Sequence, residues 1–431
     1  MSSILTNNGA MVALQTLKSI NGNLATTQAE ISTGKSVASA KDNAAVWAIS
    51  KTMEADVKGF KGISDSLNLG ESTVAVARQA AETVTDLLTE VKGKIVAAQE
   101  ENVDRDKIQV DIDALRDQIS AVVGAAQFNG LNLIDNTNFE AGTGSVNVLA
   151  SLDRSATGVA ASDINVAKQD LGTSASSIAA TGGTYTEGTG ADQVTLNATT
   201  TGSMDLGTNG IAPTAGTGYA IRVVGVGTLT GLNTTGANTQ AGMATTEIKF
   251  VARDGDTMDD VAAGLEASFN QYLAEEGIDA ATLSVSRNGD TLSFAGGTDG
   301  TNTIQLSFDT VVADATTGAG TTIGGRLEAL SDIDVTTQSG VDTALTSIEG
   351  LIQTAIDSAS SFGSVQGRIE TQTDFISGLT DALKSGIGTL VDADMEEASA
   401  RLQALQVQQQ LGVQALSIAN QAPQSLLSLF R

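Results

Sequence analysis

The 431-residue chain contains no cysteine and no histidine, and its only prolines are Pro213 and Pro423. Without cysteine it forms no disulfide. Without histidine it lacks the base of Ser-His-Asp and Cys-His nucleophile systems, and the two absences together remove the ligands of most zinc sites. Carboxylates remain, but among 50 Asp and Glu residues close pairs are unavoidable and give no signal of a glycosidase. We therefore expect a protein that is not an enzyme and that holds no cofactor or metal.

Positive charge is scarce as well, since 23 Lys and Arg face 50 Asp and Glu and the net charge is −27. Nucleic acids and anionic lipids are bound through clustered Lys and Arg, so the sequence predicts no nucleic acid and no membrane among its partners. No apolar run approaches the 18 residues of a membrane-spanning helix. Residues 1–8 lack the basic region and apolar core of a Sec-type signal, so we expect that any export uses another route.

The near absence of proline leaves both terminal regions free of helix breakers until the last nine residues. The middle differs, because residues 171–330 hold 26 of the 46 glycines and are rich in Thr, Ser and Ala. The expected fold is therefore mainly α at both chain ends, with long paired coiled-coil-like helices, around a central β-rich α+β insert.

A heptad pattern predicts one long helix in the N-terminal half. Spacings of three and four alternate over 16 positions, of which only Asp56 and Gly70 are not apolar. At about 1.5 Å per residue, such a helix is on the order of 80 Å long. The seam consists of Val46, Ile49, Met53, Asp56, Phe60, Ile63, Leu67, Gly70, Val74, Ala77, Ala81, Val84, Leu88, Val91, Ile95 and Ala98.

The C-terminal half repeats this pattern, broken only by Gln366, Thr373 and Thr380. Because each long helix has one narrow apolar seam, we expect the two helices to pack on each other. The second seam consists of Val341, Leu345, Ile348, Ile352, Ala355, Ala359, Phe362, Gln366, Ile369, Thr373, Ile376, Thr380, Leu383, Ile387 and Leu390.

A shorter helix follows the first long one, with Asp104 as its expected N-cap. Residues 128–131, Phe-Asn-Gly-Leu, predict a turn because Asn-Gly tolerates positive φ. Short strands are expected at residues 131–134, 146–149 and 164–166. The helix carries the stripe Ile108, Ile112, Leu115, Ile119 and Val122.

The outermost ends carry further apolar stripes. One runs through Ala13, Leu17, Ile20, Leu24, Thr27 and Ile31, and another through Met395, Ala398, Leu402, Leu405, Gln409, Gly412, Leu416 and Ala419. A second face of the C-terminal helix holds Ala404, Val407, Leu411 and Ile418. A two-helix hairpin buries one face of each helix, so the extra stripe predicts further partners, most economically other copies of the chain. The apolar tail at residues 426–430 also marks an interaction site.

The predicted polymerisation surface takes residues from all three stripes and the tail, with Leu14 beside the first stripe: Leu14, Leu17, Ile20, Leu24, Ile31, Leu402, Leu405, Val407, Gln409, Leu411, Leu416, Ile418, Leu426, Leu427, Leu429 and Phe430. Two interpretations of the glutamine run 408–410 stay open. It either lies on a solvated helix face, or forms interhelical amide hydrogen bonds that fix the register.

A break between the N-terminal helices is expected at residues 32–38. Gly34 suits the position just past a helix C-terminus, and Thr33, Gly34 and Lys35 form a candidate hinge. The stretch Ser39-Ala40-Lys41-Asp42 fits a capping-box-like start of the next helix.

Within the insert, residues 247–250 predict a strand, 254–257 a turn, 261–265 a short helix, and 288–294 a second turn and strand. Asp254, Asp256, Asp259 and Asp260 are of the residue type that binds calcium. However, Met258 and Asp259 occupy EF-hand positions five and six, so the EF-hand pattern fails. A turn followed by a helix N-terminus, where the helix dipole favours acids, is the preferred interpretation.

Several ordered motifs closely resemble bacterial flagellin. Near the N-terminus they are residues 31–34 (Ile-Ser-Thr-Gly), 37–45 (Val-Ala-Ser-Ala-Lys-Asp-Asn-Ala-Ala) and 127–130 (Gln-Phe-Asn-Gly). Near the C-terminus they are residues 392–395 (Asp-Ala-Asp-Met), 408–410 (Gln-Gln-Gln) and 419–430 (Ala-Asn-Gln-Ala-Pro-Gln-Ser-Leu-Leu-Ser-Leu-Phe). The likeness covers about 1–170 and 331–431. The closing Leu-Phe-Arg resembles alphaproteobacterial flagellins, and residues 220–310 are similar to a β-rich module of flagellin inserts and hook-associated proteins.

The resemblance implies a secreted subunit that self-polymerises into the extracellular flagellar filament for motility. It implies an inner-tube helical domain at 1–44 and 388–431, an outer-tube domain at 45–170 and 331–387, and a solvent-facing insert at 171–330. The implied partners are further copies of the chain, the flagellar type III export apparatus, a flagellin export chaperone, and the filament cap and hook-junction proteins.

The family's immune-receptor site resembles the run Leu88-Thr89-Glu90-Val91-Lys92, with Glu90 in place of the family's arginine. The hypothesis is that this chain stimulates that receptor poorly. Two alternatives to a filament subunit stay open: a hook–filament junction protein, and an acidic secreted adhesin or calcium-dependent surface protein.

Overall fold

A computed structural model describes residues 7–155, 158–188, 192–196, 200–209, 213–225, 239–278, 282–296, 304–312 and 321–429. The chain divides into two compact units. The terminal unit comprises residues 1–65, 151–159 and 373–431, and the central unit comprises residues 66–150 and 160–372.

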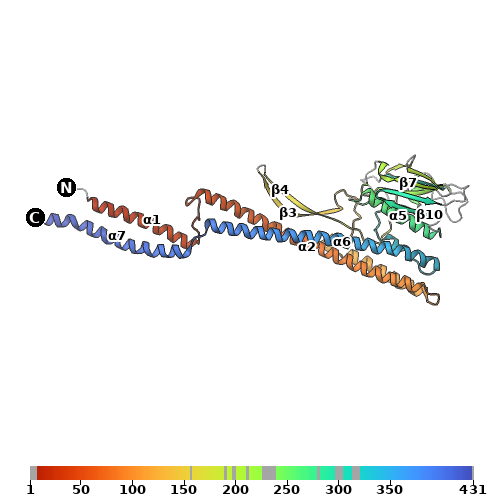
Figure 1. Cartoon of the computed structure of the whole chain (residues 1–431), viewed down its shortest axis with the longest axis horizontal. Helices are drawn as coiled ribbons and strands as arrows, with labels where there is room; N and C mark the ends of the chain where they lie inside the picture. Colours follow the sequence, from red (N-terminus) through yellow and green to blue (C-terminus); the bar gives the residue numbers. More distant parts are fainter. Residues whose placement is uncertain are drawn as a thin grey trace. The chain divides into compact units, whose positions relative to one another are not determined.

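Five helices form the two chain ends (Figure 1): α1 (Asn8–Thr33), α2 (Ala44–Ala98), α3 (Arg105–Ala125), α6 (Gln338–Val391) and α7 (Met395–Leu429). Within the terminal unit, α1 lies beside α7. Long helices at both ends around a β-rich insert confirm the predicted fold class. None of the helices in the described part of the chain is long and apolar enough to cross a membrane.

The predicted seam of α2 is buried at every position from Ile63 to Ala98. Its glycine has a specific cause, because a Cβ on Gly70 would lie 2.6 Å from Cγ1 of Val148 on β3. The seam prediction is wrong at Ile49, which is 53% exposed, while its neighbour Ser50 is buried. At this end of α2 the covered position is one residue later, at Ser50, whose hydroxyl donates a hydrogen bond to Trp47 O at 2.9 Å. A heptad count that starts from Ile63 therefore names the wrong residue.

The α6 seam is buried or half-buried from Val341 to Ile387, and Leu390 at its end is 39% exposed. The polar break at Gln366 is paired, since Arg78 Nε on α2 donates a hydrogen bond to Gln366 Oε1 at 2.9 Å. The predicted packing of the two long helices is thus present, with one of its polar positions used for a hydrogen bond between them.

The shorter elements match the sequence in kind and differ in length. Asp104 caps α3 by accepting a hydrogen bond from Lys107 N. Asn129 and Gly130 adopt φ of 52° and 81° and join β1 (Gln127–Phe128) to β2 (Leu131–Asn132). The two other expected strands form a longer hairpin of β3 (Ser145–Ser155) with β4 (Gly158–Ala167).

The described residues of the insert form two antiparallel sheets and one principal helix, α5 (Met258–Glu275). In the first sheet, strand β12 (Ile304–Val312) pairs with β5 (Thr184–Thr186), β6 (Gln193–Leu196) and β8 (Gly218–Gly225). Strand β8 also pairs with β9 (Lys249–Val251). The second sheet joins β10 (Leu283–Asn288), β11 (Thr291–Gly296) and β7 (Thr200–Asp205). A short helix, α4 (Gln240–Ala244), precedes β9.

One hydrophobic core joins α5 to both sheets. The rings of Phe269 on α5 and Phe294 on β11 meet edge to face at 5.4 Å between centroids. The core begins at Val194, earlier than the expected module start near residue 220. The predicted strand at 247–250, helix at 261–265 and turn at 288–289 correspond to β9, α5 and the β10–β11 connection.

Candidate functional site on the terminal helix pair

The α1–α7 pair is held together by the two predicted inner stripes. Leu17 and Ile20 on α1 are half-buried, and Ala398 and Leu405 on α7 are buried. The helices approach closely at Gly412, where an added Cβ would lie 3.2 Å from Leu17 Cδ1. The stripes of α1 and α7 therefore cover each other, which leaves the opposite faces uncovered.

Polar contacts fix the register of this pair. Gln409 Nε2 donates a hydrogen bond to Asn21 Oδ1 at 2.8 Å, which favours the interhelical interpretation of that glutamine. Asn7 accepts a hydrogen bond from Ala10 N at the start of α1, and its Nδ2 donates to Ala419 O at 2.8 Å. One amide thus both caps α1 and ties it to α7.

The outer faces of the pair expose large apolar side chains. The exposed fractions are 58% at Met11, 64% at Val12 and 58% at Leu14 on α1, and 55% at Val407, 58% at Leu411, 54% at Val413 and 69% at Ile418 on α7. We call these seven residues the outer stripes. Because exposed apolar surface of this kind marks interaction sites, they form the candidate functional surface.

The sequence interpretation placed Leu14, Val407, Leu411 and Ile418 on this surface and missed Met11, Val12 and Val413. The signal was available, since all three are apolar residues outside the inner stripes. The predicted residues Leu402, Leu405, Gln409 and Leu416, with Leu17, Ile20, Leu24 and Ile31, lie instead on the covered side of the pair. The side chains of Leu426, Leu427 and Leu429, and all of Phe430, lie outside the described part of the structure.

Charge is distributed unevenly between the two units. The terminal unit contains 10 Lys and Arg against 12 Asp and Glu, a net charge of −2, whereas the central unit contains 13 against 38, a net charge of −25. Lys18 is the only charged residue among 7–29, and residues 402–429 contain none. The surface that exposes apolar side chains is therefore also the surface with least electrostatic repulsion.

The helices of both chain ends are interrupted at the same place in the structure. We call this region, residues 34–43 and 392–394, the joint. Gly34 ends α1 with φ of 69°, as its sequence position predicted. Val391 O accepts hydrogen bonds from Ser36 N at 2.7 Å and from Ser36 Oγ at 3.2 Å. Ala393 N donates to Gly34 O at 3.0 Å. The predicted hinge is thus hydrogen-bonded to the break between α6 and α7.

The predicted helix start at residues 39–42 is wrong, because α2 begins at Ala44. Asp42 Oδ2 accepts hydrogen bonds from Ser39 N and Ser39 Oγ, which forms a local turn and lowers the pKa of the Asp42 carboxyl. The N-cap of α2 is Asn43, whose Oδ1 accepts from Val46 N at 3.2 Å. A side-chain bond from Asp to the backbone three residues earlier can either start a helix or close a local turn, and the sequence alone does not say which of the two forms.

Ion pairs tie the joint to α2. Lys35 Nζ lies 3.7 Å from Glu54 Oε1, and Lys51 Nζ donates a hydrogen bond to Glu54 Oε2 at 2.7 Å. The hydrogen bond from Lys51, with the charges of both lysines, lowers the pKa of the Glu54 carboxyl. The Glu54 carboxylate therefore remains charged at neutral pH and holds Lys35 of the hinge near α2.

Two further predicted positions lie in the central unit. Glu90 is exposed on α2 between the buried Leu88 and Val91. The aspartates of the β9–α5 turn have structural roles: Asp260 completes a capping box with Thr257, and Asp254 Oδ2 accepts a hydrogen bond from Gly144 N. These contacts agree with the turn and helix N-terminus preferred on sequence.

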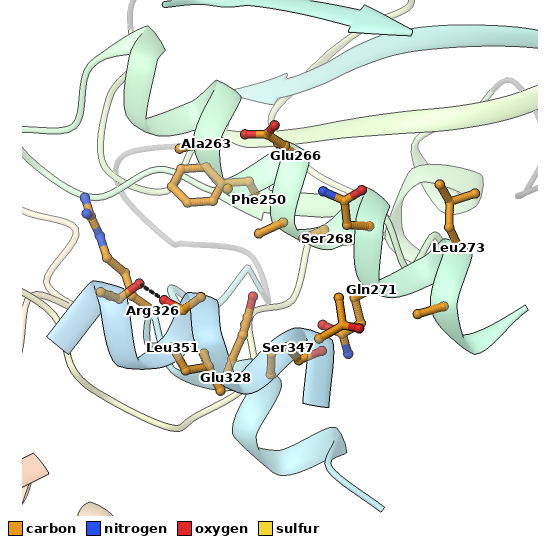
Figure 2. Close-up of a pocket in the computed structure, with 18 of the residues that line it drawn as sticks. Phe250, Ala263, Glu266, Ser268, Gln271, Leu273, Arg326, Glu328, Ser347 and Leu351 are labelled. Atoms are coloured by element: carbon orange, nitrogen blue, oxygen red, sulfur yellow. Dashed lines mark hydrogen bonds between the residues drawn. The ribbon is translucent and has the colours of Figure 1, made fainter. Parts of the chain in front are cut away.

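A cleft of about 630 Å³ lies between α5 and α6 in the central unit (Figure 2). Several polar side chains that line it are engaged within the chain. Arg326 donates hydrogen bonds to Asp256 and Asp260, and Gln271 donates to Glu275. The cleft therefore offers a weaker site than the outer stripes, whose apolar groups have no cover within the described chain.

A long helical pair with paired chain ends, uncovered apolar faces and little charge defines the class of structural subunits that polymerise through their termini. Two family models match the chain: the bacterial flagellin N-terminal helical region at residues 4–139 and the bacterial flagellin C-terminal helical region at residues 340–430. Flagellin A of Rhizobium meliloti is 33% identical over 435 residues, and flagellin FljM of Caulobacter vibrioides is 29% identical over 434 residues. The first comparison covers 100% of both chains, the second 100% of this chain and 99% of the relative. The chain belongs to the bacterial flagellin family.

The chain is accordingly a structural subunit of the extracellular flagellar filament. Its relatives include flagellins of two alphaproteobacterial genera, as the closing motif suggested. Among solved structures, FliC from Burkholderia pseudomallei is 15% identical, with a TM-score of 0.28, 69% of this chain covered and 99% of that chain. The Legionella pneumophila hook-associated protein-3 is 11% identical, with a TM-score of 0.28, 83% of this chain covered and 98% of that chain. Values this low carry no argument for either role.

Proposed function

We propose that the outer stripes of α1 and α7 are the surface through which copies of this chain polymerise. The observation that carries the proposal is the exposure of seven large apolar side chains on a helix pair whose other faces already cover each other. Burial of such side chains stabilises by about 1.5–3 kcal/mol each, and the near absence of charge on this pair lets copies approach closely. The apolar tail residues Leu426, Leu427, Leu429 and Phe430 are included in the proposed surface on their sequence alone.

The proposed arrangement places residues 1–44 and 388–431 in an inner tube, residues 45–170 and 331–387 in an outer tube, and residues 171–330 toward solvent. The charge distribution supports it, because the net charge of −25 belongs to the central unit and −2 to the terminal unit. Repulsion between like charges is weakest where water and salt screen it. Packing the near-neutral unit inward and the acidic unit outward minimises repulsion between neighbouring subunits.

Assembly then proceeds by docking of α1 and α7 at the growing tip, where a neighbour covers their outer stripes. The two helices become fully ordered only when they dock at the tip. The entropy lost in ordering them is therefore offset by the new contacts only at the correct site. Before assembly the chain engages the flagellar type III export apparatus and a flagellin export chaperone, and at the filament ends the cap and hook-junction proteins.

Paired substitutions test the surface. Leu411→Gln combined with Ile418→Gln should leave the monomer fold unchanged, because both side chains are exposed. It should raise the critical concentration for seeded assembly about tenfold or more. Val110→Gln is the matched control, since Val110 on α3 is 67% exposed but lies outside the pair. Equal assembly of the double variant and the wild type would overturn the proposal.

Exposed Glu90 underlies a second proposal, that this chain stimulates the flagellin-sensing immune receptor poorly. Lys92, two residues on, forms an ion pair with Glu349 at 2.5 Å, so the run carries no uncompensated positive charge. A cell reporter assay should show a stronger response to Glu90→Arg than to the wild type. Full potency of the wild-type chain would reject this proposal without touching the polymerisation surface.

A further inference from the structure

We infer that the cleft between α5 and α6 binds a linear aliphatic polyamine, a flexible cation whose ammonium groups are joined by short methylene chains. Every residue that lines the cleft belongs to the central unit, so this site is separate from the polymerisation surface on α1 and α7. Its volume of about 630 Å³ is of the size that proteins use for small ligands, about 300–1,000 Å³.

The cleft is elongated. On the α5 side its lining runs from Asp260 to Ala274, which is about 21 Å of helix at 1.5 Å per residue. Figure 2 shows Gln271 of α5 and Ser347 of α6 on opposite sides of the cleft. Both walls contain small residues, which leave room for a thin extended chain: Ala263, Gly264, Ala267 and Ala274 on α5, and Ser347 and Gly350 on α6.

A second cavity of about 290 Å³ adjoins the cleft and extends it toward the start of α6. Gln271, Ala329 and Ser347 line both cavities. We call the second cavity the acidic extension, because Glu275, Asp332 and Asp334 line it. A ligand that lies along the cleft therefore reaches these three carboxylates.

The negative charge of the acidic extension is not neutralised within the described part of the chain, where no Lys or Arg forms an ion pair with Glu275, Asp332 or Asp334. Gln271 Nε2 donates hydrogen bonds to Glu275 Oε1 at 2.9 Å and to Asp332 Oδ2 at 3.1 Å. Two carboxylates thus lie around one neutral amide. Partial burial raises the pKa of the Glu275 carboxyl, and the charge of Asp332 adds to this effect. An ammonium group at this place relieves the repulsion.

The two arginines of the cleft are already engaged and do not offset this charge. Arg253 Nε lies 2.6 Å from Asp170 Oδ2, and Arg326 Nη2 lies 3.0 Å from Asp256 Oδ1 and 3.3 Å from Asp260 Oδ1. The two cavities together are lined by two arginines against six carboxylates, a net charge of −4. Such a site attracts cations and repels anions. The six carboxylates are Asp260, Glu266, Glu275, Glu328, Asp332 and Asp334.

Among cations, a polyamine matches both the charge and the lining. A metal ion fits less well, because in the described ranges no three acidic side chains are grouped so as to hold one. A compact cation leaves the apolar part of the cleft, at Phe250, Leu273 and Leu351, unfilled. Amino groups with a lysine-like pKa of about 10.4 are protonated at neutral pH, and the methylenes between them cover apolar surface as lysine stems do.

Titration calorimetry of the full-length monomer with spermidine tests the inference, in about 0.15 M sodium chloride to screen diffuse attraction. We expect one saturable site per chain. Glu275→Gln combined with Asp332→Asn should weaken binding about tenfold or more, because it removes the carboxylates that the ammonium group contacts. Glu100→Gln combined with Glu101→Gln is the matched control, since it removes the same charge at two exposed positions between α2 and α3. The control should change binding by less than about twofold.

A substitution that preserves charge tests the apolar part of the cleft. Gly350→Leu extends a side chain from the α6 wall, where an added Cβ has nothing within 4 Å. It should weaken spermidine binding about tenfold by occupying the space of the methylene chain. Gly93→Leu on α2, where an added Cβ also has nothing within 4 Å, should leave binding unchanged. Urea midpoints of both leucine variants establish that the chain is folded.

Several results would overturn the inference. Absence of saturable binding would do so directly. Equal weakening by the two charge variants would show only a general attraction of polycations to an acidic protein. Competition by magnesium chloride as effective as that by spermidine would show that the alkyl chain contributes nothing. Wild-type affinity in Gly350→Leu would place the ligand outside the cleft.

Discussion

At the scale of single residues, Gly70 shows how a seam can break for a reason that local pattern does not contain. The heptad series identifies Gly70 as an exception, but its cause is Val148, which is 78 positions away along the chain. Val148 is β-branched and stiff, so it cannot readily move from a Cβ placed 2.6 Å from its Cγ1.

Substitution of this glycine should therefore destabilise the chain. We expect Gly70→Ala to lower the free energy of unfolding by about 1–3 kcal/mol through overpacking. Gly93→Ala, on the same helix with nothing within 4 Å of the new Cβ, should raise it by about 0.5–1 kcal/mol. Urea unfolding of both variants measures the difference, and effects of equal sign would refute the packing argument.

The buried ion pair of Arg222 with Asp309 is invisible to sequence analysis, because the two residues are 87 positions apart and neither belongs to a motif. Both side chains are fully buried, and Asp309 Oδ1 also accepts hydrogen bonds from Ser307 Oγ and Gly188 N. Asp309→Asn should cost about 3–5 kcal/mol of stability, because it leaves a buried guanidinium uncompensated. The double variant Arg222→Met/Asp309→Leu should recover much of that loss in urea unfolding. A double variant as unstable as Asp309→Asn would contradict this account.

The tyrosine beside that pair makes stability depend on alkaline pH. Burial and the adjacent charge of Asp309 raise the pKa of Tyr185 to about 12. The native state holds this proton more tightly than the unfolded chain, whose tyrosine pKa is about 10. Stability from Tyr185 is therefore full below about pH 10 and is lost as pH rises toward 12. Urea midpoints should fall less steeply over this range in Tyr185→Phe than in the wild type, and parallel curves would contradict the assignment.

At the scale of elements, hydrogen bonds across the joint connect the break after α1 to the break after α6. Gly34 needs positive φ, which costs a residue with a side chain about 1–2 kcal/mol. Gly34→Ala should therefore speed amide hydrogen exchange at Ser36 and Ala393 together, since both donate across the joint. Gly22→Ala, in open space within α1, should not. Faster exchange at Ser36 alone would mean that the two breaks are independent.

Periodicity predicted the elements best where one pattern persists over many turns, as in α2 and α6. It failed at Ile49 because a heptad count assumes one register along the whole helix, whereas the covered position near the start of α2 is Ser50. In the insert, β6, β7 and β8 lie in glycine- and threonine-rich sequence without a distinct alternation, so they were missed. The joint needed contacts across 355 positions, between Ser36 and Val391, which no local pattern reveals.

At the scale of the whole molecule, the separation of charge governs how copies meet. The central unit carries −25 and the terminal unit −2. Raising sodium chloride from about 0.05 M to 0.3 M shortens the distance over which exposed charges repel, so seeded growth should be faster at the higher concentration. Light scattering after addition of sheared seeds measures the rate. A rate that is unchanged or lower at high salt would show that repulsion between central units does not limit assembly.

The inner stripes that hold α1 to α7 and most of the outer stripes could be predicted from the sequence, because both are helical patterns. Which stripe faces the partner helix and which stays uncovered required the structure. Leu17 and Leu14 show the difference: both were predicted for the polymerisation surface, yet Leu17 is half-buried against α7 and Leu14 is 58% exposed.

The most direct test of polymerisation through the terminal helices is negative-stain electron microscopy of two purified chains with filament seeds. One is the wild type, and the other lacks residues 402–431, which removes most of α7. We expect long filaments of uniform width from the wild type and none from the truncated chain, with the near-ultraviolet circular dichroism of the insert retained. Filaments from the truncated chain would contradict the central role of α7.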